Sequence, residues 1–269
     1  MTLTKDLRAE GDDLYALLKD EPESVFAIKT GFKDWTVWDV IAHLHLSDAQ
    51  ALASTRGADA FKAETAPMIA MMKEGKSLID YTRIRCADLS GPDLFAQWRE
   101  TFLGMCDGFD ALDPDARLKW FGPDMGLRMF ATARQMETWA HASEIYDLLG
   151  KTRVETDRIR NVVVIGIKTY GFNFAIRKKD APQPMPHVKL TAPSGAVWEF
   201  GEPGTGNAIE GSAVEFAQVV TQTRNIADTA LKVEGPNATE WMSIAQCFAG
   251  GAEEPPAPGT RGPKRAQIQ

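Results

Sequence analysis

Three side chains in this sequence have the types and spacing of a metal site. Glu137 and His141 lie four residues apart in a segment, residues 134–150, that has the pattern of a helix. Because a helical turn takes about 3.6 residues, the carboxylate and the imidazole project from the same face. A second expected helix carries His43 and His45, and one of these could complete a site of two histidines and one carboxylate. The same spacing also arises by chance or as an ordinary hydrogen-bonded pair on a helix.

The two histidines of the second segment cannot both face one ion, because residues two apart on a helix point about 200° apart. Apolar residues define the buried side of this helix: Val37, Val40, Ile41 and Leu44. His43 lies beside that side and His45 lies toward its edge. A core histidine with a backbone partner is the alternative for His43, and a surface histidine is the alternative for His45. The residues alone leave the choice between them open.

Long amphipathic segments that could position these residues recur through the first 150 residues. Apolar residues repeat at helical spacing over four long segments, 3–19, 36–54, 90–111 and 125–149, and a further helix is expected over 59–74. Thr36 followed by Asp39 is a variant of the capping box, and Gly150 is suited to a left-handed helix cap. Four long helices with short connections predict an up-and-down four-helix bundle over 1–150.

The pattern changes after residue 150. A helix over 157–179, a hairpin of 188–191 with 196–200, a helix capped by Ser212, a strand over 230–234 and a helix over 238–248 are expected. These elements predict a small α+β domain over 151–250, so the whole chain is expected to be mainly α. The stretch 251–269 is rich in proline and glycine and is expected to be a mobile tail.

Composition excludes several classes of function. The 269 residues are 44% hydrophobic, enough for a buried core, and carry a net charge of -7 with a pI near 5.2. This acidic balance disfavours nucleic acid as a partner. Three isolated cysteines, Cys86, Cys106 and Cys247, argue against a disulfide framework. With neither a signal peptide nor a long apolar run, the sequence predicts a cytoplasmic protein without a membrane span.

Two motifs carry a resemblance to a known family. Asp34-Trp35-Thr36-Val37-Trp38-Asp39-Val40-Ile41-Ala42-His43-Leu44 resembles the Trp-Thr-Val-x-Asp-Val-x-Ala-His-Leu signature of the mycothiol-dependent maleylpyruvate isomerase family, a branch of the DinB-like metal-binding bundles. Glu137-Thr138-Trp139-Ala140-His141 is similar to that family's Glu-x-x-x-His motif. The resemblance covers about residues 5–150, and more weakly 151–250. It implies His43, Glu137 and His141 as metal ligands, and His45 departs from the usual pattern.

The resemblance also implies a chemistry. A divalent ion with three protein ligands and open positions can polarise a carbonyl, activate water, or bind a thiol as thiolate. In the family, the metal is thought to receive a low-molecular-weight thiol, whose thiolate adds to an activated double bond and permits cis-trans isomerisation. The implied cofactors are therefore a divalent metal, with zinc first and nickel or iron as alternatives, and a small thiol.

Other residues are candidates for catalysis. Glu144 and Asp48 lie on the two ligand-bearing helices and could orient an imidazole or move a proton. Arg224 loosely matches a family arginine in a Thr-x-Arg context and could bind a substrate carboxylate. Solvated helix charges are the plain alternative for all three.

The sequence thus predicts a metal-dependent enzyme, an isomerase or thiol transferase acting on a small-molecule substrate. A metal-dependent hydrolase and a non-catalytic metal-binding or scaffold bundle remain alternatives. The oligomeric state stays open, with a homodimer among the options.

Overall fold

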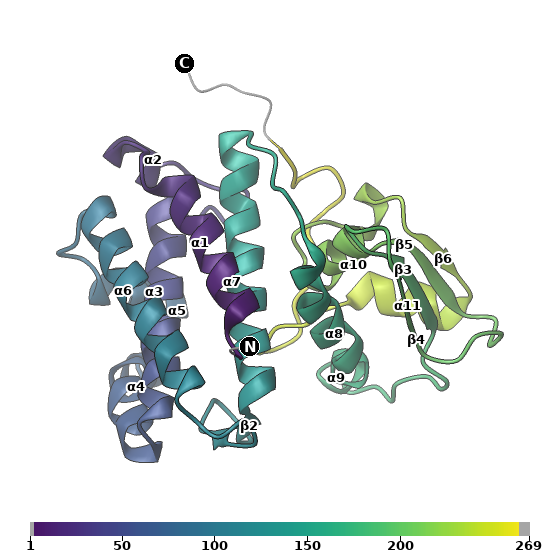
Figure 1. Cartoon of the computed structure of the whole chain (residues 1–269), viewed down its shortest axis with the longest axis horizontal. Coiled ribbons are helices and arrows are strands. Elements are labelled where there is room, and N and C mark those ends of the chain that lie inside the picture. The colour runs from purple at the N-terminus through teal and green to yellow at the C-terminus, as the bar shows by residue number, and fades with distance from the viewer. Residues whose placement is uncertain (1–2, 264–269) are drawn as a thin grey trace. The chain divides into compact units, whose positions relative to one another are not determined.

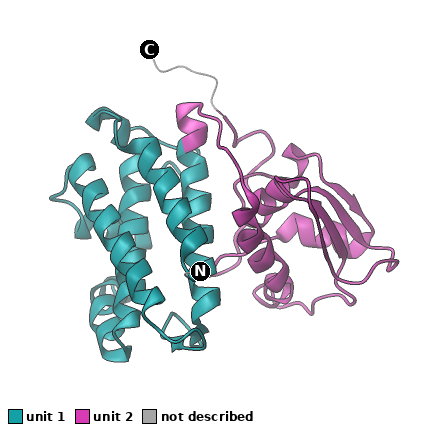
Figure 2. Cartoon of the chain, in the orientation of Figure 1, with its two compact units in different colours: residues 1–145 teal, residues 146–269 magenta. Residues whose placement is uncertain are grey.

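The computed structural model describes residues 3–263 (Figure 1). The chain divides into two compact units, Met1–Ile145 and Tyr146–Gln269 (Figure 2). The boundary falls inside the last turns of a long helix, α7 (Leu127–Leu149), so this one helix begins in the first unit and ends in the second. The sequence pattern places the division at residue 150, directly after that helix.

The first unit is helical. Its elements are α1 (Lys5–Leu18), α2 (Glu23–Phe26), α3 (Val37–Thr55), α4 (Ala58–Lys73), α5 (Leu78–Arg85), α6 (Gly91–Asp110) and the first part of α7, with a two-stranded ribbon, β1 (Arg117–Leu118) and β2 (Met125–Gly126), between α6 and α7. The four long expected helices are all present, and their ends lie within two residues of the predicted ones. The predicted helix over 59–74 is α4, and Pro67 is accommodated inside it.

The core of the first unit forms where α3 and α1 pack against α6 (Figure 1). Large aromatic side chains of α6 fill it, and Trp98, Phe102 and Phe109 are fully buried. Gly11 of α1 lets the two helices approach closely, since a Cβ at this position would overlap the Phe102 ring. The helix that carries His43 therefore lies on a densely packed support.

The second unit combines a sheet with short helices. Its elements are a 3-10 turn η1 (Asp157–Ile159), α8 (Arg160–Lys168), α9 (Tyr170–Ala175), β3 (His187–Thr191), β4 (Val197–Phe200), β5 (Ala208–Ser212), α10 (Ala213–Val220), a 3-10 turn η2 (Ile226–Asp228), β6 (Lys232–Glu234) and α11 (Pro236–Ile244). The strand order is β4-β3-β5-β6. The β3–β4 and β5–β6 pairs are antiparallel, and β3 and β5 are parallel. The mainly helical fold with a small α/β second part is therefore confirmed.

Some local predictions for the second unit were wrong. The expected continuous helix over 157–179 is interrupted at Thr169, whose hydroxyl donates to the carbonyls of Ile165 and Gly166 and competes with the helical pattern. Strand β5 is not predicted, because the glycine-rich sequence ahead of it indicates only a turn. The predicted hairpin is present, with Leu190 opposite Trp198.

The segment after α11 makes specific contacts within the second unit. The Arg177 guanidinium and the Gln222 amide both donate to the carbonyl of Glu253, at 2.6 and 3.1 Å. Asn225 donates to the carbonyl of Pro256 at 2.8 Å. Residues 251–263 thus make hydrogen bonds to the rest of the second unit, the mobility of the tail stays a prediction, and 264–269 lie outside the described residues.

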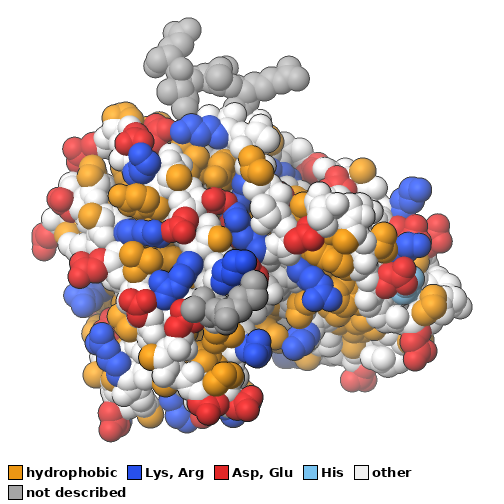
Figure 3. All heavy atoms as spheres, in the orientation of Figure 1, with side chains coloured by type: hydrophobic (Ala, Val, Ile, Leu, Met, Phe, Trp, Pro, Cys, Tyr) orange, Lys and Arg blue, Asp and Glu red, His pale blue; other side chains and the backbone are white. Residues whose placement is uncertain are grey.

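Within residues 3–263, no helix combines the length and apolar character that crossing a membrane requires. On the face drawn in Figure 3, acidic and basic side chains are interspersed.

Candidate metal centre

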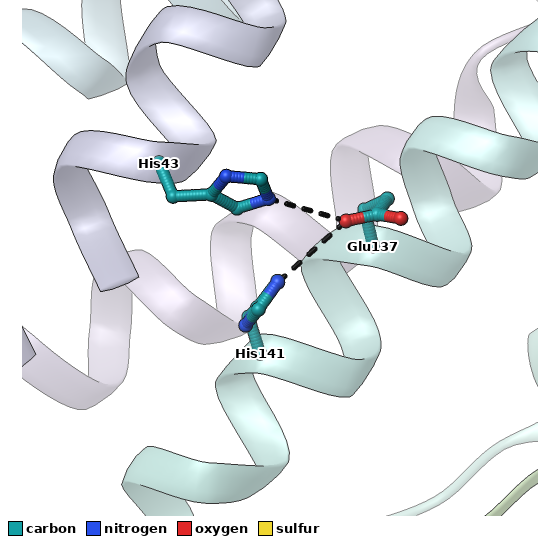
Figure 4. A group of neighbouring side chains, drawn as sticks. All are labelled: His43, Glu137 and His141. Carbon is teal, nitrogen blue, oxygen red and sulfur yellow. Dashed lines mark hydrogen bonds and ion pairs between the residues drawn. The ribbon is translucent and has the colours of Figure 1, made fainter. Parts of the chain in front are cut away.

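The structure brings together the three residues with metal-ligand chemistry. His43 of α3 and the pair Glu137 and His141 of α7 point toward one another (Figure 4). The Nε2 atoms of His43 and His141 lie 3.4 and 3.6 Å from the same carboxylate oxygen, Oε2 of Glu137. One ligand atom from each residue falls within 4.8 Å of the other two. Two imidazoles and one carboxylate therefore converge from two helices, as a small ion would require.

Polar side chains fix the start of α3, two turns before His43. The Thr36 hydroxyl accepts from the Asp39 amide at 3.1 Å, and the Thr36 amide donates to the Asp39 carboxylate at 2.9 Å, which completes the predicted capping box. Arg83 of α5 then forms a two-pronged ion pair with Asp39, at 2.8 and 2.9 Å. Burial acts to raise the pKa of Asp39, but the bonds from Arg83 and Thr36 outweigh it and lower the pKa.

A buried ion pair joins α3 to α7 close to the cluster. Arg134, one turn before Glu137, donates from Nε to Oδ1 of Asp48 at 2.9 Å, and its Nη2 lies 2.8 Å from the same oxygen. The indole nitrogen of Trp98 donates to the other carboxylate oxygen at 3.1 Å. Asp48 is completely buried. Its carboxylate thus links α3 to α7 through Arg134 and to α6 through Trp98, and a catalytic role for Asp48 stays a prediction.

The pKa shifts of Glu137 and His141 favour the protonation states that can bind a cation. Burial would raise the pKa of Glu137, but hydrogen bonds from His141 and His43 hold it well below its usual range. Burial lowers the pKa of His141, and the nearby Glu137 carboxylate only partly opposes that shift. The favoured state therefore has an ionised carboxylate and a neutral His141 imidazole, the forms that bind a metal.

The cluster is partly open to solvent. The exposed fractions of the His43, Glu137 and His141 side chains are 14%, 22% and 11%. Each of the three side chains thus keeps some contact with solvent. Phe32 and Trp35, from the loop ahead of α3, pack against the imidazoles.

The other candidate residues occupy different settings. Glu144, one turn after His141 on α7, is buried at 3% exposure. Arg224 lies in the second unit beyond the end of α10 and forms an ion pair of 2.7 Å with Asp147, also in that unit. The roles of Glu144 and Arg224 stay predictions. His45 is half-buried and is not part of the cluster, and burial lowers its pKa.

Sequence reasoning missed the aromatic residues around the cluster. Trp35 stands out in the sequence only as part of a motif, and Phe32 does not stand out at all. Their contacts depend on the backbone of a tight turn over residues 32–35. Gly31 signals a turn in this connection, but the sequence does not indicate which residues the turn brings together. An aromatic pair just ahead of a histidine-bearing helix was the available clue.

Fold and site together define a helical-bundle protein with a cluster of two histidines and one carboxylate between two helices. The family described as "Mycothiol maleylpyruvate isomerase N-terminal domain" matches residues 7–146. Two curated relatives, both uncharacterized proteins from strains of Mycobacterium tuberculosis, are 35% identical over 245 residues, which is 91% of this chain and 94% of each relative. The chain therefore belongs to the mycothiol maleylpyruvate isomerase family, as the motifs indicated.

Solved structures agree on the fold. The crystal structures of the mycothiol-dependent maleylpyruvate isomerase and of its histidine-to-alanine mutant each match with a TM-score of 0.51 at 12% identity. The match covers 81% of this chain and 86% of the isomerase chain. It therefore extends past the helical bundle into the second unit.

Proposed function

We propose that this protein is a metal-dependent enzyme that uses a low-molecular-weight thiol on a small substrate, as an isomerase or a thiol transferase. The observation that carries the proposal is the convergence of His43, Glu137 and His141 within 4.8 Å in a family named for a thiol-dependent isomerase. Mycothiol, the thiol in the family's name, is the first choice of thiol. Maleylpyruvate and similar unsaturated carboxylates are the first substrates to try.

The donor set fits a borderline-soft divalent ion. Two imidazole nitrogens and one carboxylate oxygen are common ligands of catalytic zinc, which keeps a further position for water or substrate. The partial exposure of the three side chains supports such an open side. Nickel and iron are compatible with the same donors.

A metal held by these residues would stabilise a bound thiol in its thiolate form near neutral pH. The residues of the chain would hold the ion and shape its surroundings. Glu137 offers a negative charge, His43 and His141 offer neutral nitrogen donors, and Phe32 and Trp35 cover one side with apolar surface. An external thiol is also consistent with the state of the chain's own cysteines. Burial raises the pKa of Cys106 to about 12 and raises the pKa of Cys86, which keeps both thiols protonated near neutral pH. Neither thiol is suited to act as a nucleophile.

Metal content and thiol binding test the proposal together. Wild-type protein reconstituted with Zn²⁺ or Co²⁺ and passed through a desalting column should retain about one ion per chain. His141→Ala should lose the ion while its circular dichroism stays the same. His45→Ala, on the same helix as His43, is the matched control and should keep it.

Mycothiol added to the Co²⁺ protein should produce a thiolate-to-metal charge-transfer band, and maleylpyruvate should then isomerise. A folded wild type that retains no ion would overturn the proposal. Retained metal with no thiol band, together with hydrolysis of ester or amide substrates, would favour the hydrolase instead.

A further inference from the structure

Two aromatic side chains ahead of α3 contact the imidazoles of the cluster. The Trp35 ring is edge-on to His43, with ring centres 5.5 Å apart, and parallel to His141 at 6.1 Å. Phe32 meets His141 edge-on at 5.3 Å and Trp35 at 4.9 Å. The imidazole rings are 4.8 Å apart. The four rings form one contact group, in which Trp35 touches both imidazoles as well as Phe32.

A tight turn places Phe32 and Trp35 side by side. The Trp35 amide donates to the Phe32 carbonyl at 2.8 Å, and the buried Thr30 closes the turn through its amide, which donates to the Trp35 carbonyl at 2.8 Å. The two residues between them, Lys33 and Asp34, have φ angles of 48° and 58°. Turns of this kind favour Asn-Gly, so Lys33 is held here in a conformation that lysine disfavours, whereas aspartate adopts it more readily. Such strain is retained where the surrounding structure enforces it, and often at functional sites.

Ring packing has a direct consequence for metal ligands. An imidazole binds an ion only when its nitrogen lone pair points at the ion, so the ring must be held within about 10–20° of that direction. Many metal sites achieve this with a hydrogen bond to the second ring nitrogen. Here, Trp35 makes an edge contact to His43 and a parallel contact to His141. This single side chain therefore restricts the rotation of both imidazole rings.

We infer that Trp35 is a positioning residue that orients the His43 and His141 imidazoles for a shared metal ion, and that the Phe32–Trp35 turn holds it there. This role rests on the proposed metal site but is distinct from it, because it concerns how the two imidazole nitrogens are oriented by the Trp35 indole. Trp35 acts through the two imidazoles and donates no ligand atom.

The test compares Trp35→Ala and Trp35→Phe with wild type in two forms of the full chain. In the Co²⁺-loaded form, Trp35→Ala should bind the ion about ten-fold more weakly, the lower end of the effect of removing an orienting partner. Its visible ligand-field spectrum should change in shape, because the donor directions change. Trp35→Phe keeps a ring in place and should recover most of the affinity and spectrum.

The metal-free form separates this inference from the proposed function. The ring-proton NMR signals of His43 and His141 should shift and broaden in Trp35→Ala, while those of His45 and His187 stay in place. If wild type binds no metal, the proposed function fails, but these signals still report whether Trp35 orients the rings.

Two controls keep the result specific. Trp120, also half-buried in the first unit, packs against Phe61, Phe121 and Phe130, and Trp120→Ala should leave the Co²⁺ spectrum unchanged. Replacing Lys33-Asp34 by Asn-Gly keeps the turn and should also leave the spectrum unchanged.

Trp35→Ala protein with wild-type affinity, spectrum and histidine signals would overturn the inference. If the alanine variant does not fold, Trp35→Leu takes its place in the same measurements, because leucine fills part of the space without a ring. The leucine variant should then show the same weaker binding and altered histidine signals, and wild-type behaviour in it would equally overturn the inference.

Discussion

Glu137 has an unusually low pKa because two imidazoles approach the same carboxylate oxygen. The hydrogen bonds from the two imidazoles lower the pKa by more than burial raises it. At His141, burial dominates and lowers the pKa, with Glu137 in partial opposition. Both groups therefore hold their metal-binding forms to a lower pH than the same residues would in an unfolded chain.

The pH dependence of metal binding follows from these directions. A histidine whose pKa is lowered by folding stays neutral below its usual value of about 6.5, and it loses that form as the pH falls through the lowered value. Because Glu137 stays ionised in mild acid, protons compete at the imidazole and not at the carboxylate. Co²⁺ affinity, measured by titration from about pH 8 to pH 5, should stay nearly level down to the usual histidine pKa and fall only as the pH approaches the lowered pKa of His141. A ten-fold loss between about pH 8 and pH 7 would contradict this.

How far the site was predictable depends on how local each feature is. The pair Glu137 and His141 needs only helical spacing, which the sequence displays. The choice of His43 over His45 needs a motif, because apolar periodicity alone leaves it open. The Trp35 contacts could not be predicted, since they depend on left-handed backbone at both Lys33 and Asp34, and lysine rarely adopts it.

At the scale of elements, helices with clear start signals were predicted well. Thr36 with Asp39 and Ser90 with Asp93 mark the starts of α3 and α6, and both caps form. Helix α5 was overlooked, although Ser77 forms a capping box with Asp80. Its eight residues carry little apolar periodicity, so the cap was the only readable signal. The consequence matters for the site, because α5 supplies the arginine that binds Asp39.

The buried pair of Asp48 and Arg134 should be the strongest polar link between α3 and α7. Asp48→Asn keeps the shape but leaves the buried guanidinium without a counter-charge, which should cost about 3–5 kcal/mol of unfolding free energy. Urea denaturation of the metal-free protein measures this. The double variant Asp48→Asn with Arg134→Met removes both charges and should cost less than the sum of the two single changes.

An exposed ion pair is the matched control for that measurement. Asp107, 76% exposed, accepts from Arg8 at 2.7 Å, and Asp107→Asn should cost less than about 1 kcal/mol. Equal effects of Asp48→Asn and Asp107→Asn would show that the buried pair does not hold the two helices together. Additive effects at Asp48 and Arg134 would lead to the same conclusion.

At the scale of the whole molecule, the chain consists of two units with different architectures, and all three residues of the cluster belong to the first. Family membership was readable from the sequence because the motifs lie on the two helices that carry these residues. The sheet order of the second unit could not be predicted, because β5 pairs in parallel with β3 although β4 lies between them in the sequence. Non-local pairing of that kind leaves no signature in a single strand.

This division predicts where a bound ion will stabilise the chain. A ligand present at 100 times its Kd stabilises the state that binds it by about 2.7 kcal/mol. It therefore suppresses only those local unfolding events that disrupt its binding site. Those events move α3 or the Glu137–His141 part of α7, whereas opening of the sheet β3 to β6 leaves the ligands in place.

Hydrogen exchange of the full chain, followed by mass spectrometry with and without Zn²⁺, measures this directly. Peptides from α3 and from α7 around Glu137 should exchange more slowly with the ion, while peptides from β3 and β5 should not change. His141→Ala should abolish the difference, because it removes a ligand and leaves both units otherwise intact. Slower exchange spread evenly over both units would instead mean that the two units open together, and the ion would then stabilise the molecule as a single cooperative body.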